Sequence, residues 1–478
     1  MAPDPLDVST GLISPVNPHV IVQFGATGDL VSRKLVPGLF HLAQAGLVPE
    51  CRIIGTSLDD LDDEGFRAFA RESLDEFARH GIADEAFASF SENLSFVSQT
   101  AGADGLAKAV AVQEDDLGGE PRRLHYLSVP PRAAREVVRI LGEAGLVDRA
   151  RIIMEKPFGT DLASSLELNN SLHQTFAEHQ IFRIDHFLGK EAALNIRAFR
   201  FANGLFEPIW NRSHIDHVQI DVPETLGLGH RAPFYETTGA YRDMVVTHLF
   251  QVMAFMAMEP PTSLEPRAIS EEKNKVFRSM LPSSPSTSFG ASTPATSTSR
   301  ACRPTPRPRR SSPSAARSTT GGGPVSRSSC ARASGWPRAP GSKLSLSFYG
   351  KRPGPGMKLD KLSLQFSLHE TGRSADVLEA YERLIYDAMI GDHTLFTTAE
   401  GIERLWELSS PLLSAPPPTR PYATGSWGPN SIHQLVSPMP GGCRSSGPDA
   451  TAERHRSGQT AGGEARYAPK AAKVVRCG

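Results

Sequence analysis

A glycine-containing turn joins a short β-branched run to an amphipathic run near the start of the chain. Residues His19–Phe24 have the composition of a buried strand. Gly25-Ala-Thr-Gly28 follows, and apolar residues then recur at helical spacing from Leu30 to Leu42, with Asp29 placed to cap the predicted helix. Such a turn lets backbone amides approach a phosphate at the positive end of a helix. Because the pattern is G-x-x-G rather than the full dinucleotide fingerprint, a plain strand–helix connection stays open as an alternative.

Further strand-like runs alternate with helical patterns along the first half of the chain. These runs are residues 52–55, 124–129 and 151–154. Strands that alternate with helices pair in parallel, which predicts an α/β fold with a Rossmann-like doubly wound sheet. After about Asp185 the pattern changes, and an alternating strand at residues 217–222 lies between helical stretches. We therefore expect a second domain of the α+β class.

The length of 478 residues exceeds what one hydrophobic core usually holds. We predict a dinucleotide-binding domain over residues 1–185, a second α+β domain over 186–435, to which the family resemblance described below assigns substrate binding and dimerisation, and a low-complexity tail over 436–478. Residues 281–343 interrupt the second domain, because Ser, Thr, Pro, Ala, Gly and basic residues dominate there and no acidic residue occurs between Glu272 and Asp360. Their apolar content does not offset the entropy cost of folding, so we expect disorder in this segment.

Charge, hydropathy and cysteine content exclude several classes of protein. A formal net charge of -1 gives no global electrostatic reason to bind nucleic acid or a membrane surface. The first residues lack the basic start and apolar run of a secretory signal, and the longest apolar stretch, near residues 245–258, is too short to span a bilayer. The 5 cysteines contain no C-x-x-C pair, which favours a reducing compartment. We expect a cytoplasmic protein that binds neither nucleic acid nor membranes.

Longer sequence blocks indicate a particular family far more specifically than the glycine turn does alone. The turn with its flank reads G-A-T-G-D-L and then R-K-L-V-P, and the blocks E-K-P-F-G at 155–159 and R-I-D-H-F-L-G-K-E at 183–191 follow. Other blocks lie at residues 200–203, 208–212, 380–384, 391–396 and 425–429. Together they resemble the glucose-6-phosphate dehydrogenase family over about 18–282 and 344–435. The E-K-P block also occurs in oxidoreductases similar to glucose–fructose oxidoreductase, but residues 183–191 argue against that second enzyme class.

The resemblance implies an activity and an architecture. Members of this family oxidise D-glucose 6-phosphate to 6-phospho-D-glucono-1,5-lactone with hydride transfer to NADP or NAD, the first step of the oxidative pentose phosphate pathway. Their C-terminal α+β domain carries a large, mostly antiparallel sheet through which subunits associate. The resemblance therefore implies glucose 6-phosphate as substrate, NADP (with NAD possible) as cofactor, and a homodimer or homotetramer where the sheet is intact.

The resemblance also implies a general base. Oxidation of a hemiacetal carbon needs a base that takes the hydroxyl proton while hydride leaves for the nicotinamide. A neutral imidazole suits this task near pH 7, and His248 matches the family's base, with Asp185 matching the carboxylate that fixes its tautomer. Without the resemblance, a histidine in an apolar helical run is more often a hydrogen-bonded core residue, and this alternative stays open.

Substrate-binding residues follow from the same resemblance. A sugar phosphate carries about two negative charges and needs compensating donors. The matching positions are Lys156, His186, Lys190, Glu224 and Asp243, each of which has an ordinary solvated, capping or salt-bridged charge as its alternative. Phe187 stands where many members have tyrosine, so one hydroxyl donor to the phosphate is missing.

Cofactor contacts are implied as well, with one departure. The matching positions are Gly25, Thr27, Gly28, Asp29, Leu30, Ser57 and Lys156. Members that prefer NADP carry an arginine after the second strand, whereas this chain has Leu58 followed by Asp59 and Asp60. Acidic groups repel a 2′-phosphate and accept the ribose hydroxyls of NAD, so we hypothesise a weakened preference for NADP.

A second departure concerns residues 281–343. The family's substrate lysine and several strands of its large sheet have no counterpart there, and Lys343 is not assigned that lysine's role. The acid-free composition suggests a segment translated from a shifted reading frame, with the proper frame regained near Leu344. The alternative function is therefore a catalytically impaired or silent cofactor-binding relative.

Overall fold

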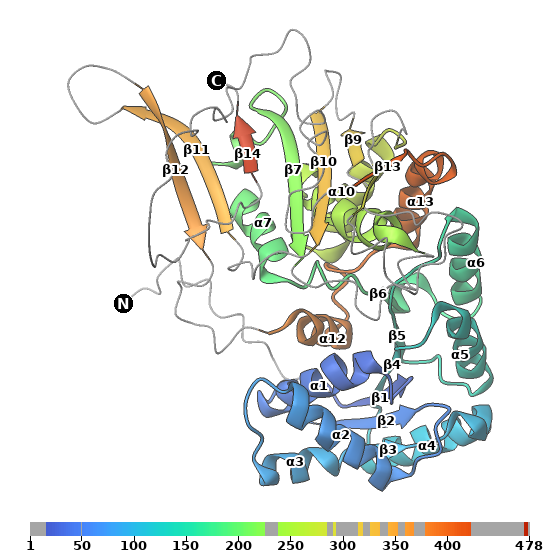
Figure 1. Cartoon of the computed structure of the whole chain (residues 1–478). Helices are drawn as coiled ribbons and strands as arrows, with labels where there is room; N and C mark the ends of the chain where they lie inside the picture. Colours follow the sequence, from blue (N-terminus) through green and yellow to red (C-terminus); the bar gives the residue numbers. More distant parts are fainter. Residues whose placement is uncertain are drawn as a thin grey trace, which may run out of the picture. The chain divides into compact units, whose positions relative to one another are not determined.

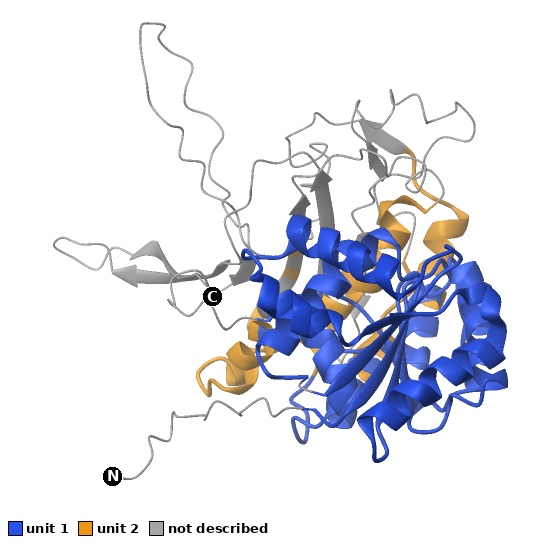
Figure 2. Cartoon of the chain, turned by 90° about the horizontal axis from the view of Figure 1, so that it is seen from below, with its two compact units in different colours: residues 1–194, 259–274, 376–406 blue, residues 195–258, 275–375, 407–478 orange. Residues whose placement is uncertain are grey.

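The chain divides into two compact units. The computed structural model describes residues 16–48, 50–224, 238–283, 290–292, 314–318, 326–334, 343–351, 359–367, 378–421 and 473–476. The first unit comprises residues 1–194, 259–274 and 376–406, and the second comprises 195–258, 275–375 and 407–478 (Figure 2). The first unit therefore holds the predicted dinucleotide-binding domain together with two segments that return from the C-terminal half.

A six-stranded parallel sheet forms the centre of the first unit. Its strands are β1 (His19–Phe24), β2 (Cys51–Thr56), β3 (Leu94–Phe96), β4 (Arg122–Leu127), β5 (Ala150–Met154) and β6 (Ile181–Arg183). Their order is β3-β2-β1-β4-β5-β6, and every neighbouring pair is parallel (Figure 1). All six residues of β1 are buried, as expected for a central strand covered on both faces. This order confirms the predicted doubly wound sheet, and it reverses at β1 and β4, where such folds bind dinucleotides.

Helices cover both faces of this sheet, in the arrangement that right-handed crossovers produce. The first group contains the π-helix η1 (Val31–Leu35), α1 (Val36–Gln44), α2 (Asp63–Phe77) and α3 (Asp84–Ser91). The second group contains α4 (Gly102–Leu117), α5 (Pro131–Glu143) and α6 (Leu162–His173), followed by the short η3 (Glu178–Gln180). Local capping sets two of the starts: Asp62 accepts a hydrogen bond from the Gly65 amide at α2, and Asp161 accepts one from the Ser164 amide at α6, both at 2.8 Å.

Residues 376–406 bring two helices into the first unit. Helix α12 (Ala380–Ile390) is held at its C-terminal end by Arg151 of β5, whose Nη1 donates to the Ala388 carbonyl at 3.0 Å. Helix α13 (Ala399–Ser414) follows, and the Trp406 indole donates to the Phe158 carbonyl at 3.0 Å. These buried contacts explain why the first unit extends beyond the predicted boundary at residue 185.

The second unit contains a mixed sheet in which three of the five strand pairs are antiparallel. Its order is β12-β11-β14-β7-β10-β9. The strands are β7 (Ile215–Glu224), β9 (Ser314–Ser318), β10 (Ser326–Ser334), β11 (Lys343–Lys351), β12 (Leu359–Ser367) and β14 (Lys473–Arg476), and β8 (Gly290–Ser292) pairs separately with β13 (Thr419–Pro421). The family resemblance predicts a large, mostly antiparallel sheet. The three antiparallel pairs among the described strands confirm this prediction.

Helices precede and follow β7 along the chain. They are α7 (Glu191–Phe201), the short η4 (Glu207–Ile209), the π-helix η6 (Tyr241–Leu249) and α9 (Phe250–Ala257), with α10 (Pro266–Ser279) after them. The buried Arg200 of α7 donates to the Phe255 carbonyl at 2.9 Å, and the Trp210 indole donates to the Met256 carbonyl at 2.7 Å. These two donors satisfy carbonyls at the C-terminal end of α9, which no intrahelical amide reaches.

Two predicted low-complexity regions are described only in part. Strands β8, β9 and β10 lie within residues 281–343, and β14 lies within 436–478. The remaining residues of the tail, and most of 281–343, lie outside the described residues. No helix in the described part of the chain has the length and apolar character needed to cross a membrane.

Candidate functional site

The glycine turn, which follows β1, contacts the ends of the two strands that flank β1. The amides of Gly25 and Ala26 donate to the Thr56 carbonyl at 2.9 and 3.2 Å, so the turn is attached to the end of β2. Gly25 has φ +73°, and a Cβ built on it would lie 2.4 Å from the Ser128 carbonyl oxygen just beyond β4. Only glycine fits this position, because both its backbone conformation and its close approach exclude a side chain. The turn therefore lies at the reversal point of the sheet.

Helical structure begins directly after the turn, and here the sequence prediction needs a correction. Asp29 is not an N-cap: it lies in the first helical turn, and its carboxylate accepts a hydrogen bond from Arg33 Nε at 2.5 Å. Arg33, four residues later, binds the Asp29 carboxylate in place of the backbone amide that an N-cap would bind. The first amides of a helix have no intrahelical acceptor, so those near Asp29 and Leu30 are suited to an anionic diphosphate. Glycines leave room for a phosphate to approach the backbone, and the helical amides can donate to it. The turn therefore fits the diphosphate of a dinucleotide.

An acidic side chain lies beside the turn. Thr27 donates a hydrogen bond from Oγ1 to Oδ2 of Asp59, and Ser57 Oγ donates to the same oxygen at 3.1 Å. These hydrogen bonds, from Thr27 first and then from Ser57, hold the pKa of Asp59 below its usual value. Leu58, where the resemblance predicts the loss of an arginine, is 78% exposed. The carboxylate of Asp59 thus lies at the end of β2, where a Rossmann fold receives the adenosine ribose.

Sequence reasoning missed an acid that follows β5. The Tyr126 hydroxyl of β4 donates to Oε1 of Glu155 at 2.6 Å. Although Glu155 keeps part of its surface exposed, protein atoms enclose its carboxyl group, and this burial raises its pKa to about 7. The nearby charge of Asp185 acts in the same direction, whereas Lys156 opposes it. Glu155 lies in the E-K-P block at residues 155–159, but the sequence prediction named only Lys156 of that block as a site residue.

Three predicted substrate residues and the predicted carboxylate partner follow β5 and β6. Lys156 follows β5, and Asp185, His186 and Lys190 follow β6, so all four lie at the carboxyl edge of the parallel sheet. Asp185 is 1% exposed, and its Oδ1 accepts a hydrogen bond from the Phe187 amide at 3.0 Å. The Lys190 ammonium lies 3.9 Å from the centroid of the Phe187 ring. The structure therefore gathers two loops of predicted substrate ligands in the first unit.

The predicted base belongs to the second unit. His248 and Asp243 both lie in η6, where they are 0% and 6% exposed. A π-helix joins residues five apart by hydrogen bonds, so these two positions are about one turn apart. Short π-helical stretches occur frequently at functional sites. Glu224 is the last residue of β7. The pairing of His248 with Asp185 stays a prediction, as does the assignment of the other substrate ligands.

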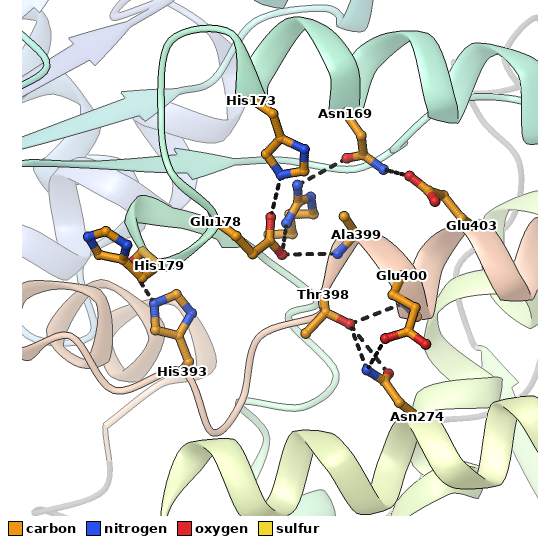
Figure 3. Close-up of polar contacts among 12 residues, drawn as sticks. Asn169, His173, Glu178, His179, Asn274, His393, Thr398, Ala399, Glu400 and Glu403 are labelled. Carbon is orange, nitrogen blue, oxygen red and sulfur yellow. Dashed lines mark hydrogen bonds and ion pairs between the residues drawn. The ribbon is translucent and has the colours of Figure 1, made fainter.

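A polar network that the sequence did not predict joins β6 to η3, α6 and α13. Arg183, 1% exposed, donates to Glu178 Oε1 at 2.8 Å and to Asn169 Oδ1 at 3.0 Å. Burial alone would raise the pKa of Glu178, but the charge and hydrogen bond of Arg183 hold it below its usual value. Figure 3 shows how Glu178 also accepts from His173 and the Ala399 amide, while Asn169 donates to Glu403 of α13. The network fixes the strand that leads into Asp185.

Comparisons with known proteins agree with this arrangement. The family model described as "Glucose-6-phosphate dehydrogenase, NAD binding domain" matches residues 22–195, and the one described as "Glucose-6-phosphate dehydrogenase, C-terminal domain" matches residues 197–292 and 338–440. Residues 293–337, which fall within the segment of unusual composition, lie outside both matches. Both halves of the architecture therefore match one family, and the interruption falls where the composition changes.

Similar relatives cover almost the whole chain. The glucose-6-phosphate 1-dehydrogenase of Rhizobium meliloti (strain 1021) is 36% identical in an alignment that covers 89% of this chain and 97% of the relative. Glucose-6-phosphate 1-dehydrogenase 2 of Mycobacterium bovis is 33% identical and covers 88% of this chain and 93% of its own length.

Solved structures of the same kind superpose on this chain. The glucose-6-phosphate 1-dehydrogenase of Mycobacterium avium gives a TM-score of 0.77 at 28% identity, covering 88% of this chain and 97% of its own. A glucose-6-phosphate dehydrogenase in complex with its substrate glucose-6-phosphate gives 0.80 at 26% identity, covering 88% and 98%. With the doubly wound sheet, the glycine turn and both family models in agreement, this chain belongs to the glucose-6-phosphate dehydrogenase family.

Proposed function

We infer that this chain oxidises the C1 hydroxyl of D-glucose 6-phosphate to 6-phospho-D-glucono-1,5-lactone, the first step of the oxidative pentose phosphate pathway. The match to both family models carries this conclusion, because it spans the cofactor half and the substrate half together. The bound nicotinamide dinucleotide supplies the hydride acceptor. The glycine turn, Thr27 and the first helical amides hold its diphosphate.

His248 acts as the general base in this proposal. Its burial in η6 keeps bulk water away from the imidazole, and a neutral ring accepts the C1 hydroxyl proton near pH 7. Asp185 fixes the tautomer that presents a lone pair to the substrate, since a carboxylate accepts the other ring N–H. Removing the hydroxyl proton lets electron density collapse towards C1 and expels hydride.

The phosphate is held by His186 and Lys190. Both follow β6, where His186 is half-buried and Lys190 is exposed. A phosphate with about two negative charges is stabilised by charge-assisted hydrogen bonds from such donors. Lys156 contacts both substrate and cofactor, and Glu224 and Asp243 accept sugar hydroxyls.

Cofactor choice follows from Asp59. A carboxylate at the end of β2 accepts the 2′- and 3′-hydroxyls of NAD, and it repels the 2′-phosphate of NADP. Leu58 supplies no guanidinium to compensate, and the cations of η1, Arg33 and Lys34, are paired with Asp29 and Glu379. We therefore propose that this chain uses both cofactors, with a weaker preference for NADP than members that carry the arginine.

Assembly and location complete the proposal. The mixed sheet of the second unit is the surface through which two subunits would associate, giving a homodimer or a homotetramer. The near-neutral charge balance and the reducing environment that the cysteine content favours agree with a cytoplasmic enzyme.

A spectrophotometric assay tests the proposed function. Purified full-length protein is mixed with glucose 6-phosphate and NAD or NADP, and reduction of the cofactor is followed through the absorbance of the reduced nicotinamide. The proposal predicts reduction that depends on glucose 6-phosphate. A catalytically silent relative, the alternative function, would bind cofactor without reducing it. That outcome would replace the catalytic proposal.

A further inference from the structure

The first turn of α12 lies against two predicted subsites of the first unit. On one side, Gly38 of α1 packs so closely that a Cβ added to it would lie 3.3 Å from Glu382 Cγ. On the other side, a Cβ added to Gly189 would lie 2.7 Å from the Ala380 carbonyl oxygen. Gly189 belongs to the loop that carries His186 and Lys190. The turn therefore contacts both the helix that follows the coenzyme turn and the loop predicted to bind phosphate.

Glu382 is the anchor of this turn. Its side chain is 5% exposed, and Arg79 donates to Oε1 and Oε2 at 2.8 and 2.9 Å. The His41 ring lies 3.0 Å from Oε2, and the Glu379 backbone amide donates to the same oxygen at 2.8 Å. A buried carboxylate with this many partners defines one position for the start of α12.

Tyr381, the neighbouring residue, extends the contact to the predicted phosphate loop. Its ring stacks on the His186 imidazole, with centroids 5.7 Å apart and an interplanar angle of 12°. Burial, then the charges of Glu155 and Asp185, raise the pKa of the Tyr381 phenol. Stacking on a flat ring restricts how the imidazole of His186 can turn.

We propose that Glu382 is a positioning residue for the sugar-phosphate subsite, acting through Tyr381 on the orientation of His186. The proposal rests on the proposed function, because it assigns His186 to the phosphate of glucose 6-phosphate. Its route is contiguous: Arg79 and His41 fix Glu382, Glu382 fixes the first turn of α12, and Tyr381 holds the His186 ring. Of the residues in this route, only His186 was predicted as a site residue, although Tyr381 and Glu382 lie in the family block at 380–384.

A role limited to stability makes a different prediction. Glu382 would then contribute to the free energy of unfolding, but the folded variant would bind glucose 6-phosphate as the wild type does. Positioning predicts instead that the folded variant loses substrate affinity and that His186 changes its environment. A matched control is available in Glu379, which is 44% exposed and contacts Lys34 and Arg79 from the same turn.

The experiment is calorimetric titration of the full-length protein with glucose 6-phosphate and, separately, with NADPH. Glu382→Gln keeps the shape of the side chain and removes its charge, and we expect about tenfold weaker binding of glucose 6-phosphate, with NADPH affinity within about twofold of wild type. Glu379→Gln should leave both affinities within about twofold. In Glu382→Gln the NMR signals of the His186 ring, assigned by their loss in His186→Gln, should move away from the positions that stacking on Tyr381 produces.

The outcomes separate this inference from the proposed function. If wild-type protein does not bind glucose 6-phosphate, the proposed function fails, while the ring signals of His186 still decide the inference. Wild-type affinity together with unmoved ring signals in Glu382→Gln would overturn it. If Glu382→Gln does not fold, Tyr381→Leu is compared with Tyr381→Phe: the inference requires only the leucine variant to displace the His186 signals, and equal signals in both variants contradict it.

Discussion

The Tyr126 hydroxyl donates a hydrogen bond to Glu155 across the carboxyl ends of two adjacent parallel strands, β4 and β5, at 2.6 Å. This contact places a titrating acid beside Lys156 and near Asp185. Burial raises the pKa of Glu155 to about 7 even though this hydrogen bond lowers it, so the carboxyl group changes its protonation near neutral pH.

Glutamine at position 155 should make stability less dependent on pH. The pKa of Glu155 is raised to about 7 in the folded protein, so its stabilising contribution is complete below the unfolded value near 4.5 and is lost as the pH rises through 7. The advantage of Glu155→Gln over wild type in urea unfolding should therefore grow by about 1–3 kcal/mol from pH 5 to pH 8. Glu136→Gln on exposed α5 is the control and should show no such growth; an equal trend in both variants would refute the assignment.

Exchanging the side chains after β2 should change the cofactor preference. Leu58→Arg combined with Asp59→Asn supplies a guanidinium and removes the carboxylate that Thr27 and Ser57 hold, so affinity for NADPH relative to NADH should rise about tenfold or more. Fluorescence titration of the reduced cofactors measures this without turnover. Asp60→Asn, at the adjacent exposed acid, serves as the control. An unchanged ratio in the double variant would mean that Asp59 does not select the cofactor.

Alanine at position 25 should disrupt the coenzyme turn. The new Cβ would meet the Ser128 carbonyl at 2.4 Å in a backbone conformation with φ +73°, so Gly25→Ala should lose about 2–4 kcal/mol of stability and most of its dinucleotide affinity. Gly46 has φ +70° with nothing within 4 Å of an added Cβ, and Gly46→Ala should cost only about 1 kcal/mol. Equal costs would show that the approach to Ser128 has no role.

Removing the buried guanidinium of Arg183, the last residue of β6, should destabilise the first unit. Arg183→Met leaves Glu178 and Asn169 without their buried partner, and because Glu178 is 43% exposed we expect a loss of about 2–3 kcal/mol rather than the full cost of a broken buried pair. The exposed pair of Arg135 with Glu167 is the comparison, and Arg135→Met should cost less than about 0.5 kcal/mol. Urea unfolding of both variants at pH 7 makes the measurement; similar losses would argue against a structural role for Arg183.

Local patterns predicted the parts of the fold that depend on neighbours in sequence. The β-branched run of β1, the glycine turn and the alternation of strands and helices were sufficient for the parallel sheet, because period and turn chemistry are local properties. The capping role of Asp29 was predicted wrongly, since an N-cap and an i,i+4 ion pair with Arg33 place the same acid at nearly the same position.

Local sequence patterns could not predict the contacts between segments that are distant in sequence. Glu382 bonds His41 from 341 positions away, and Tyr126 bonds Glu155 from 29 positions away. Neither partner has a sequence signal that points to the other, because the sheet order and the return of α12 bring them together. The candidate site could be anticipated only at positions that match family blocks, and its supporting residues emerged from the structure.

The most direct test of the proposed chemistry is the turnover of His248→Asn under saturating glucose 6-phosphate and NADP. An amide side chain of similar size does not accept a proton at neutral pH, so kcat should fall by about 10²–10⁴ while calorimetric affinities for substrate and cofactor stay within about threefold of wild type. A kcat within about twofold of wild type, with both ligands bound normally, would contradict the assignment of His248 as the base.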